Sequence, residues 1–198
     1  PFLVMEYLEG ESLADRLDRC ERLPEEEMRH LARELLDALA AAHTQGVVHR
    51  DIKPENIHIL APGRDGERVK LLDFGISSKA DEALYKLTQT GSVLGTPHYM
   101  SPEQARGDAE LDHRIDLYAV GVVLYECVVG EVPFDAPNYN RLIRMIIEEE
   151  PLPPRQRGAV ISDKTEQFIM WALEKEPALR VHSAEAMLDW LERTGRGE

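Results

Sequence analysis

The spacing of apolar residues predicts a chain made mostly of helices. The segment Leu23-Pro24-Glu25-Glu26-Glu27 is a strong helix start, because proline suits the first turn and acids complement the positive end of the helix dipole. Apolar residues then recur at helical spacing until Gly46, namely Leu31, Leu35, Leu36 and Leu39. The same periodicity predicts further helices over residues 139–149, 163–174 and 184–193.

One further segment, residues 116–129, is apolar on nearly every face, which is typical of a helix that is buried all round. Its apolar run is interrupted by Glu126 and is shorter than the roughly 18 residues that a membrane span needs. We therefore expect a central core helix, and no membrane segment in this chain.

Two short apolar runs, Ile57–Leu60 and Val69–Leu72, are predicted strands. The residues between them include Pro62-Gly63-Arg64-Asp65-Gly66, which favours a hairpin turn. From Phe74 to Pro102 the periodicity is lost, and a loop of that length is usually functional or disordered. The pattern thus predicts a mainly α fold with one small β-hairpin ahead of a long loop.

Composition narrows the class of protein. The 198 residues, 43% of them hydrophobic, suffice for one domain with a sizeable core. The net charge of −14 argues against a protein that binds nucleic acid or an anionic membrane surface. Two cysteines, Cys20 and Cys127, make no disulfide framework, which favours a reducing compartment. The opening Pro1-Phe2-Leu3-Val4-Met5 looks like the middle of an apolar strand and predicts that the chain begins inside a larger protein.

The candidate chemistry lies in two segments that flank the predicted hairpin. His49-Arg50-Asp51-Ile52-Lys53-Pro54-Glu55-Asn56 precedes the first strand, and Asp73-Phe74-Gly75 follows the second. Together they supply a carboxylate base, a cation and two oxygen ligands, which is the set that phosphoryl transfer with Mg²⁺ needs. Each segment alone is compatible with a turn or a surface salt bridge, but their joint occurrence in this order makes that interpretation improbable.

These motifs resemble those of the eukaryotic-type serine/threonine protein kinases, in their bacterial-like form. The resemblance covers essentially the whole chain and implies the large C-terminal lobe of a protein kinase-like fold. The hinge would occupy residues 3–12 and the C-terminal lobe residues 13–198. The sequence has no glycine-rich loop, strand lysine or partner glutamate helix of the N-terminal lobe. We therefore expect this lobe alone to be inactive.

The resemblance also implies roles for single residues. Asp51 would accept the proton of the substrate hydroxyl, and Lys53 would neutralise the transferring phosphoryl group. Thr96, in Gly95-Thr96-Pro97, resembles the threonine of serine/threonine kinases. Mg²⁺ would be held by Asn56 and Asp73. The ATP contacts would be Met5 as gatekeeper, the backbone of Glu6 and Leu8, Ser12 near the ribose, and Lys53 and His58.

His58 departs from the family, which usually has leucine or methionine at this place as the floor of the adenine pocket. Structural roles would fall to the stacked pair His49 and Phe74, to the buried ion pair of Glu103 with Arg180, and to Asp116, which would hold the catalytic loop by hydrogen bonds.

Regulation is expected in the long loop. Leu87-Thr88-Gln89-Thr90 resembles the double-threonine autophosphorylation site of bacterial kinases, and Arg50 would pair with a phosphorylated residue there. The hypothesis is that a second copy of the kinase phosphorylates Thr88 and Thr90 in trans. The alternative is an ordinary polar loop.

The expected reaction of the parent protein is Mg²⁺-dependent transfer of the γ-phosphate of ATP to serine or threonine of a protein substrate, in the cytoplasm, where ATP is found. A membrane anchor, if the parent has one, belongs to segments outside these residues. One alternative is a pseudokinase or regulatory scaffold, which the intact catalytic set disfavours. Another is a small-molecule kinase, which the peptide-docking segment 95–103 disfavours. His30, His43, His113 and His182 lack metal-ligand spacing and are expected at surfaces or helix ends.

Overall fold

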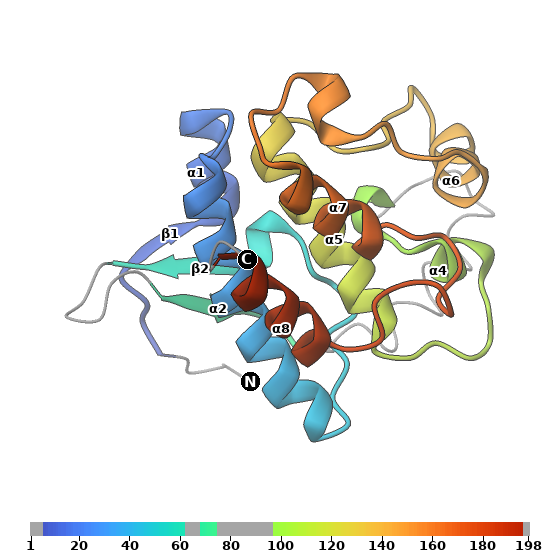
Figure 1. Cartoon of the computed structure of the whole chain (residues 1–198). Coiled ribbons are helices and arrows are strands. Elements are labelled where there is room, and N and C mark those ends of the chain that lie inside the picture. Colours follow the sequence, from blue (N-terminus) through green and yellow to red (C-terminus); the bar gives the residue numbers. More distant parts are fainter. Residues whose placement is uncertain (1–5, 62–67, 75–96, 196–198) are drawn as a thin grey trace.

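The computed structural model describes residues 6–61, 68–74 and 97–195, and it is predominantly helical (Figure 1). The α-helices are α1 (Leu13–Cys20), α2 (Glu25–Thr44), α4 (Pro102–Arg106), α5 (Arg114–Val129), α6 (Tyr139–Glu148), α7 (Asp163–Ala172) and α8 (Ala184–Gly195). Short 3₁₀ helices are η1 (Pro54–Asn56), η4 (Pro97–Tyr99) and η5 (Pro154–Arg157).

A small antiparallel sheet lies at one side of the helices, in the order β1 (Gly10–Ser12), β2 (Ile57–Leu60) and β3 (Val69–Leu71). The two predicted strands are confirmed as β2 and β3, which pair antiparallel with Ile59 opposite Val69, and the predicted turn at residues 62–66 lies outside the described residues. Strand β1 was not predicted. It approaches β2 at Gly10, whose φ is +143° and where a Cβ would lie 2.0 Å from the carbonyl oxygen of Ile59. Only glycine avoids that overlap.

Helix α5 is the centre of the core, and the prediction that it is buried all round is confirmed. From Ile115 to Val129 all its residues except Glu126 are buried. It packs against α2 and α7, and Figure 1 shows α7 crossing in front of it. The contact with α7 is close, because a Cβ at Gly121 would lie 2.8 Å from the Cβ of Ala172. A helix enclosed in this way gives the rest of the lobe a fixed reference.

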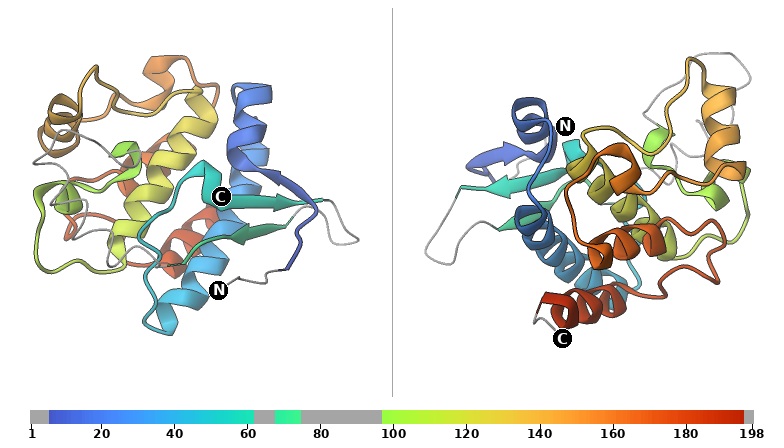
Figure 2. Two further views of the ribbon diagram at one scale, coloured as in Figure 1. Left: turned by 180° about the vertical axis from the view of Figure 1, so that it is seen from behind. Right: turned by 45° about the horizontal axis from the view of Figure 1, so that its top comes forward.

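Helix α2 begins at Glu25 as predicted, and α8 packs along it in both views of Figure 2. Arg29 of α2 ties these helices together, donating to the carbonyl oxygen of Leu191 at 2.7 Å and to Thr194 Oγ1 at 3.0 Å. The same guanidinium donates to Thr165 Oγ1 of α7 at 3.2 Å. A partly buried network therefore joins the first long helix to the last two.

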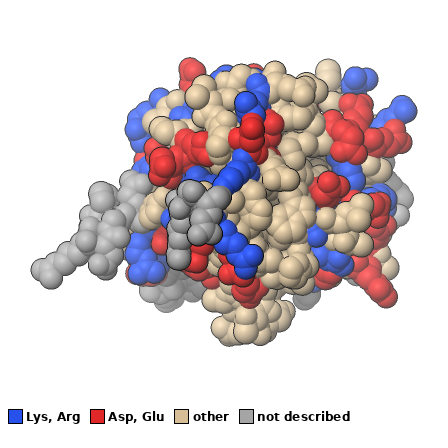
Figure 3. Space-filling view, viewed as in Figure 1, with Lys and Arg blue, Asp and Glu red and all other residues tan. Residues whose placement is uncertain are grey.

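The predicted helices over residues 139–149, 163–174 and 184–193 are confirmed as α6, α7 and α8, with ends that differ by up to two residues. A second, smaller apolar cluster under α6 consists of Phe134, Leu142 and Ile146. Acidic and basic side chains are interspersed over the face shown in Figure 3. Among the described residues, no helix combines the length and apolar character that crossing a bilayer requires.

Candidate active site

Asp116 fixes the loop between α2 and η1, which carries the candidate catalytic residues. Its side chain lies in the first turn of α5 and is 1% exposed. Its carboxylate accepts the backbone N–H of His49 and the backbone N–H of Arg50, each at 2.8 Å. Arg50 has a φ of +69°, which is unfavourable for a residue with a Cβ. The two hydrogen bonds therefore stabilise a strained backbone immediately before Asp51.

His49 connects this loop to the segment that follows β3. Its Nε2–H donates to the carbonyl oxygen of Leu72 at 2.8 Å, and its Nδ1 accepts the backbone N–H of Asp51 at 3.3 Å. These partners together assign the neutral tautomer that carries its proton on Nε2. The ring of Phe74 contacts the imidazole with a centroid distance of 4.7 Å and an interplanar angle of 59°. The expected pair thus meets in a tilted contact rather than a parallel stack.

Asp51, Lys53 and Asn56 form one hydrogen-bonded group. Lys53 Nζ donates to both carboxylate oxygens of Asp51, at 3.0 and 2.8 Å. Asn56 Nδ2 donates to the carbonyl oxygen of Asp51 at 2.8 Å and to its Oδ2 at 2.9 Å. The Asp51 side chain is 40% exposed, so an incoming hydroxyl can reach the carboxylate that these two donors orient.

The two candidate metal ligands lie next to each other in the fold. The backbone N–H of Leu72 donates to the carbonyl oxygen of Asn56 at 2.9 Å. Asp73 directly follows Leu72, so the two candidate ligands lie on adjacent backbone segments. The amide nitrogen of Asn56 is directed to Asp51, which leaves Oδ1 as its ligand atom, and Asp73 is exposed. Among the described residues, no cluster of three or more histidine, cysteine or acidic side chains could hold a metal. A pair of oxygen donors fits Mg²⁺, which commonly takes one or two protein ligands together with phosphates and water.

The described part of the predicted hinge begins at Glu6, and Met5 lies outside it. The carboxylate of Glu6 forms an ion pair with Lys70 of β3. Leu8 is half-buried between Glu6 and β1. The hinge segment is therefore attached to the same small sheet that leads into Asp73.

Ser12 and His58 face each other across β1 and β2. Ser12 is also the N-cap of α1: its Oγ accepts the Asp15 N–H at 3.0 Å and donates to Asp15 Oδ2 at 2.6 Å. Hydrogen bonding to Ser12 lowers the pKa of the Asp15 carboxyl. The Nε2 atom of His58 is buried and lacks a hydrogen-bond partner. Both predicted ATP contacts therefore lie on the sheet beside the hinge.

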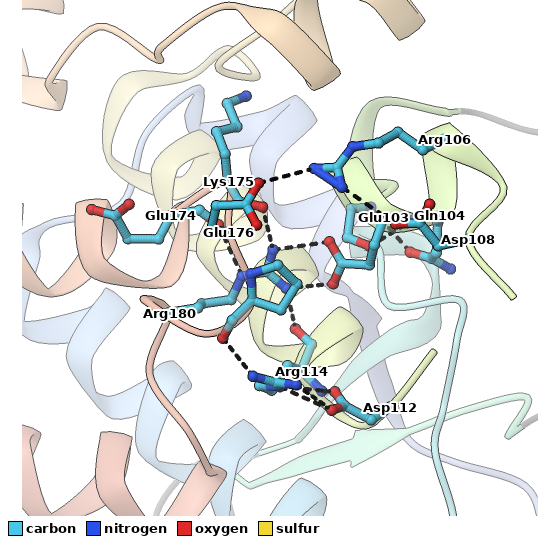
Figure 4. Close-up of polar contacts among 12 residues, drawn as sticks. Glu103, Gln104, Arg106, Asp108, Asp112, Arg114, Glu174, Lys175, Glu176 and Arg180 are labelled. Atoms are coloured by element: carbon cyan, nitrogen blue, oxygen red, sulfur yellow. Dashed lines mark hydrogen bonds and ion pairs between the residues drawn. The ribbon is translucent and has the colours of Figure 1, made fainter. Parts of the chain in front are cut away.

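Glu103 and Arg180 form a buried ion pair that anchors α4 (Figure 4). The guanidinium donates to the two carboxylate oxygens at 2.7 and 3.0 Å, and the side chains of Arg180 and Glu103 are 0% and 6% exposed. It also donates to the carbonyl oxygens of Arg114 and Glu174, at 2.9 and 3.0 Å. One side chain thus joins α4, the start of α5 and the segment after α7.

A cavity of about 650 Å³ is lined by residues of η4, α5 and α6 and of the segment between α5 and α6. Its lining includes the acids Glu126, Glu131 and Asp135. Tyr99 Oη donates to Glu126 Oε2 at 2.7 Å, and burial raises the pKa of both groups. The lining also includes His98 and Arg157, which lie against Asp135 and Glu131, so each of the three acids has a partner within the cavity wall.

Thr88, Thr90 and Thr96 lie outside the described residues, so the predictions for the long loop stay predictions. The side chain of Arg50 is exposed.

One residue of the site was missed. His43 was expected at a surface or a helix end, and it does lie in the last turn of α2. Its side chain, however, is only 7% exposed, and its Nε2 is 2.8 Å from Asp116 Oδ2. Its contact is 73 residues distant in sequence, so no local spacing could have indicated it.

Comparison with known proteins shows which family has a similar sequence and fold. Residues 1–191 match the family described as protein kinase domain. The chain is 46% identical over 189 residues to serine/threonine-protein kinase pkn3 of Myxococcus xanthus. The aligned region covers 93% of this chain and 34% of that protein. It is 37% identical over 198 residues to serine/threonine-protein kinase PknB of Mycobacterium leprae, covering 100% of this chain and 31% of that protein.

Among solved structures, the crystal structure of Rad53 1-466 in complex with AMP-PNP superposes with a TM-score of 0.75 and 26% identity, over 94% of this chain and 46% of that one. The chain spans about a third of the length of the two curated relatives. Together with the candidate catalytic loop, whose backbone Asp116 of α5 holds, these similarities show that the chain belongs to the protein kinase domain family.

Proposed function

We propose that this chain is the C-terminal lobe, with the hinge, of a serine/threonine protein kinase that transfers the γ-phosphate of ATP to hydroxyls of a protein substrate. The observation that carries the proposal is the hydrogen-bonded group of Asp51, Lys53 and Asn56, which lies next to Asp73. The relatives named serine/threonine-protein kinase support it.

The chemistry follows from these positions. The exposed carboxylate of Asp51 accepts the proton of the substrate hydroxyl, while Asn56 and Lys53 hold it in orientation. Lys53 also brings a positive charge to the phosphoryl group during transfer. A contribution of Thr96 to the same step is proposed from the resemblance alone, because Thr96 lies outside the described residues. Because catalysis of phosphoryl transfer is mostly positioning and charge stabilisation, a rigid loop is as important as the base itself.

ATP and Mg²⁺ complete the site. The adenine and ribose of ATP would lie against the hinge and the sheet, at Met5, Glu6, Leu8, Ser12 and His58. Mg²⁺ would be held by Asn56 Oδ1 and Asp73, and when bound it neutralises charge on the phosphates.

The residues that grip the α- and β-phosphates in the family are not in this sequence. Catalysis is therefore proposed for a protein in which an N-terminal lobe accompanies this chain, and the reaction is placed in the cytoplasm with ATP. Control by phosphorylation of Thr88 and Thr90 in trans, with Arg50 binding the phosphate, belongs to the same proposal.

The test is transfer of labelled γ-phosphate by the kinase that contains both lobes, to itself and to a basic protein. Asp51→Asn is expected to lower the rate by roughly 10²–10⁴-fold, as for loss of a general base. Asp37→Asn, at an exposed position of α2, is the matched control and should leave the rate unchanged. A folded, nucleotide-binding and loop-activated wild type that transfers no phosphate would instead support the pseudokinase or scaffold alternative.

A further inference from the structure

Lys175 lies in the segment after α7, and its side chain reaches the end of α6. Its Nζ donates to the carbonyl oxygen of Ile146 at 2.7 Å and lies 4.1 Å from the centroid of the Phe134 ring. Ile146 and Phe134 are 0% and 4% exposed and belong to the apolar cluster under α6. Figure 4 shows the Lys175 side chain directed away from the pair of Glu103 and Arg180. The ammonium group is thus placed against the cluster that holds α6.

This contact satisfies a carbonyl group that α6 itself leaves unpaired. The helix ends at Glu148, and the N–H of Glu149 donates to the carbonyl oxygen of Met145, so the helical ladder ends one residue before Ile146. A buried carbonyl group without a partner is unfavourable, and a cation complements the negative end of a helix dipole. Lys175 supplies both the hydrogen bond and the charge.

The cost of placing an ammonium group here argues against simple space filling. Burial lowers the pKa of Lys175 to about 8. The charged groups around it have opposing effects, because the carboxylates of Glu150 and Glu149 raise this pKa and the guanidinium groups of Arg180 and Arg106 lower it. A methionine of similar length would avoid the desolvation of a charge. What methionine would lack is the N–H directed at α6.

Helix α6 forms one wall of the cavity beside the candidate catalytic loop. It contacts η4, and its Met145 lines the cavity together with Tyr99 and Glu126. Besides burial, the negative charge of Glu55 raises the pKa of both Tyr99 and Glu126, so Glu55 lies near this wall. Glu55 follows Asp51 by four residues. A polypeptide that presents a hydroxyl to Asp51 therefore has α6 and η4 within reach.

We propose that Lys175 is a positioning residue for the protein substrate. Its Nζ–H fixes the last turn of α6, and α6 together with η4 forms the surface on which the substrate chain rests beside Asp51. The substrate step rests on the proposed kinase function, whereas the structural step concerns only the contact of Lys175 with α6.

Three variants separate this contact from the charge. Lys175→Met keeps the stem and removes the donor, and Lys175→Arg keeps a cation with N–H donors. Arg144→Met is the matched control, because it removes an exposed cation of α6 with the same change in net charge.

The kinase with both lobes is assayed with histone as the protein substrate. Lys175→Met should raise KM for histone about tenfold, the effect of losing one hydrogen bond from a charged group, with kcat and KM for ATP within about twofold of wild type. Lys175→Arg and Arg144→Met should keep all three constants within about twofold of wild type.

Two further measurements on the same protein need no turnover. Amide hydrogen exchange in the last turn of α6 should become at least about tenfold faster in Lys175→Met, while the amides of α5 keep their protection and report an intact fold. The dissociation constant for fluorescently labelled histone should rise about tenfold in Lys175→Met and stay unchanged in Arg144→Met.

Unchanged exchange in the last turn of α6 in a folded Lys175→Met protein would overturn the inference, as would unchanged histone binding. A KM for ATP that rises as much as KM for histone would also overturn it, because the effect would then not be confined to the protein substrate. If the wild type transfers no phosphate but histone binding responds to Lys175→Met as expected, the proposed function fails and the positioning role stands.

Discussion

The buried pair of Glu103 with Arg180 is the most demanding test of how this lobe is held together. Arg180→Met leaves the Glu103 carboxylate, 6% exposed, without its counter-charge, which costs about 3–5 kcal/mol of unfolding free energy. It also strips a donor from the carbonyl oxygens of Arg114 and Glu174, which places the cost at the upper end of that range. Glu103→Gln keeps an acceptor and all the carbonyl contacts, so we expect a smaller loss of about 1.5–3 kcal/mol.

Urea unfolding of the chain measures these losses, and a double variant isolates the pair. Glu103→Leu with Arg180→Met removes both charges, so its cost should fall short of the summed costs of Glu103→Leu alone and Arg180→Met alone by up to about 3 kcal/mol. Arg144→Met is the matched control. Its ion pair with Glu148 is as short, at 2.7 Å, but its side chains are 74% and 57% exposed, which predicts a loss below about 1 kcal/mol. A loss for Arg180→Met as small as that of the control, or strict additivity in the double variant, would refute the reasoning.

Three further changes test other contacts. Gly121→Ala should lower the unfolding free energy by about 1–3 kcal/mol in urea titrations despite the better helix propensity of alanine, because its Cβ would meet Ala172 at 2.8 Å; a neutral result would mean that α5 and α7 separate freely. Burial lowers the pKa of Lys175 to about 8 from 10.5, so between these pH values the unfolded chain binds more protons and stability rises with pH. From pH 7 to pH 10 the unfolding free energy of the wild type should rise by roughly 1–2 kcal/mol relative to that of Lys175→Met, after allowance for partial exposure. A difference between the two proteins that is the same at both pH values would contradict this. Gly10→Ala should detach β1 from Ile59, which would appear as faster amide exchange in β1 with α5 unaffected.

The elements predicted from sequence are those that carry a long signal of their own. Helix α5 is apolar over most of its length, and α2 has both a start signal and a repeating apolar face. Helix α1 has only Leu13 and Leu17 buried in eight residues, and α4 is five residues long, so neither contains enough turns to show a period. Strand β1 depends on pairing with residues about 50 positions later, which no local pattern reveals.

The candidate site likewise contains residues that a local pattern indicates and residues that it does not. Asp51, Lys53 and Asn56 are close in sequence, so their spacing alone indicated a common purpose. The support beneath them is not local: Asp116 is 67 residues from His49. His43 was assigned to a surface or helix end because an isolated histidine carries no spacing signal, although tertiary packing buries it. Spacing therefore indicated the candidate reacting groups, whereas Asp116 was indicated by the family resemblance and the contact of His43 by neither.

The contact between α2 and α8 has a consequence for synthesis. Arg29 and Leu191 are 162 residues apart, and chains elongate at roughly 5–20 residues per second, so α2 leaves the ribosome on the order of ten to thirty seconds before its partner exists. Throughout that interval the side of α2 that packs against α8 stays uncovered, although α5 can already cover another part of the helix. We expect this helix to be a binding site for ribosome-associated chaperones, and the release of the chaperone to coincide with the emergence of α8.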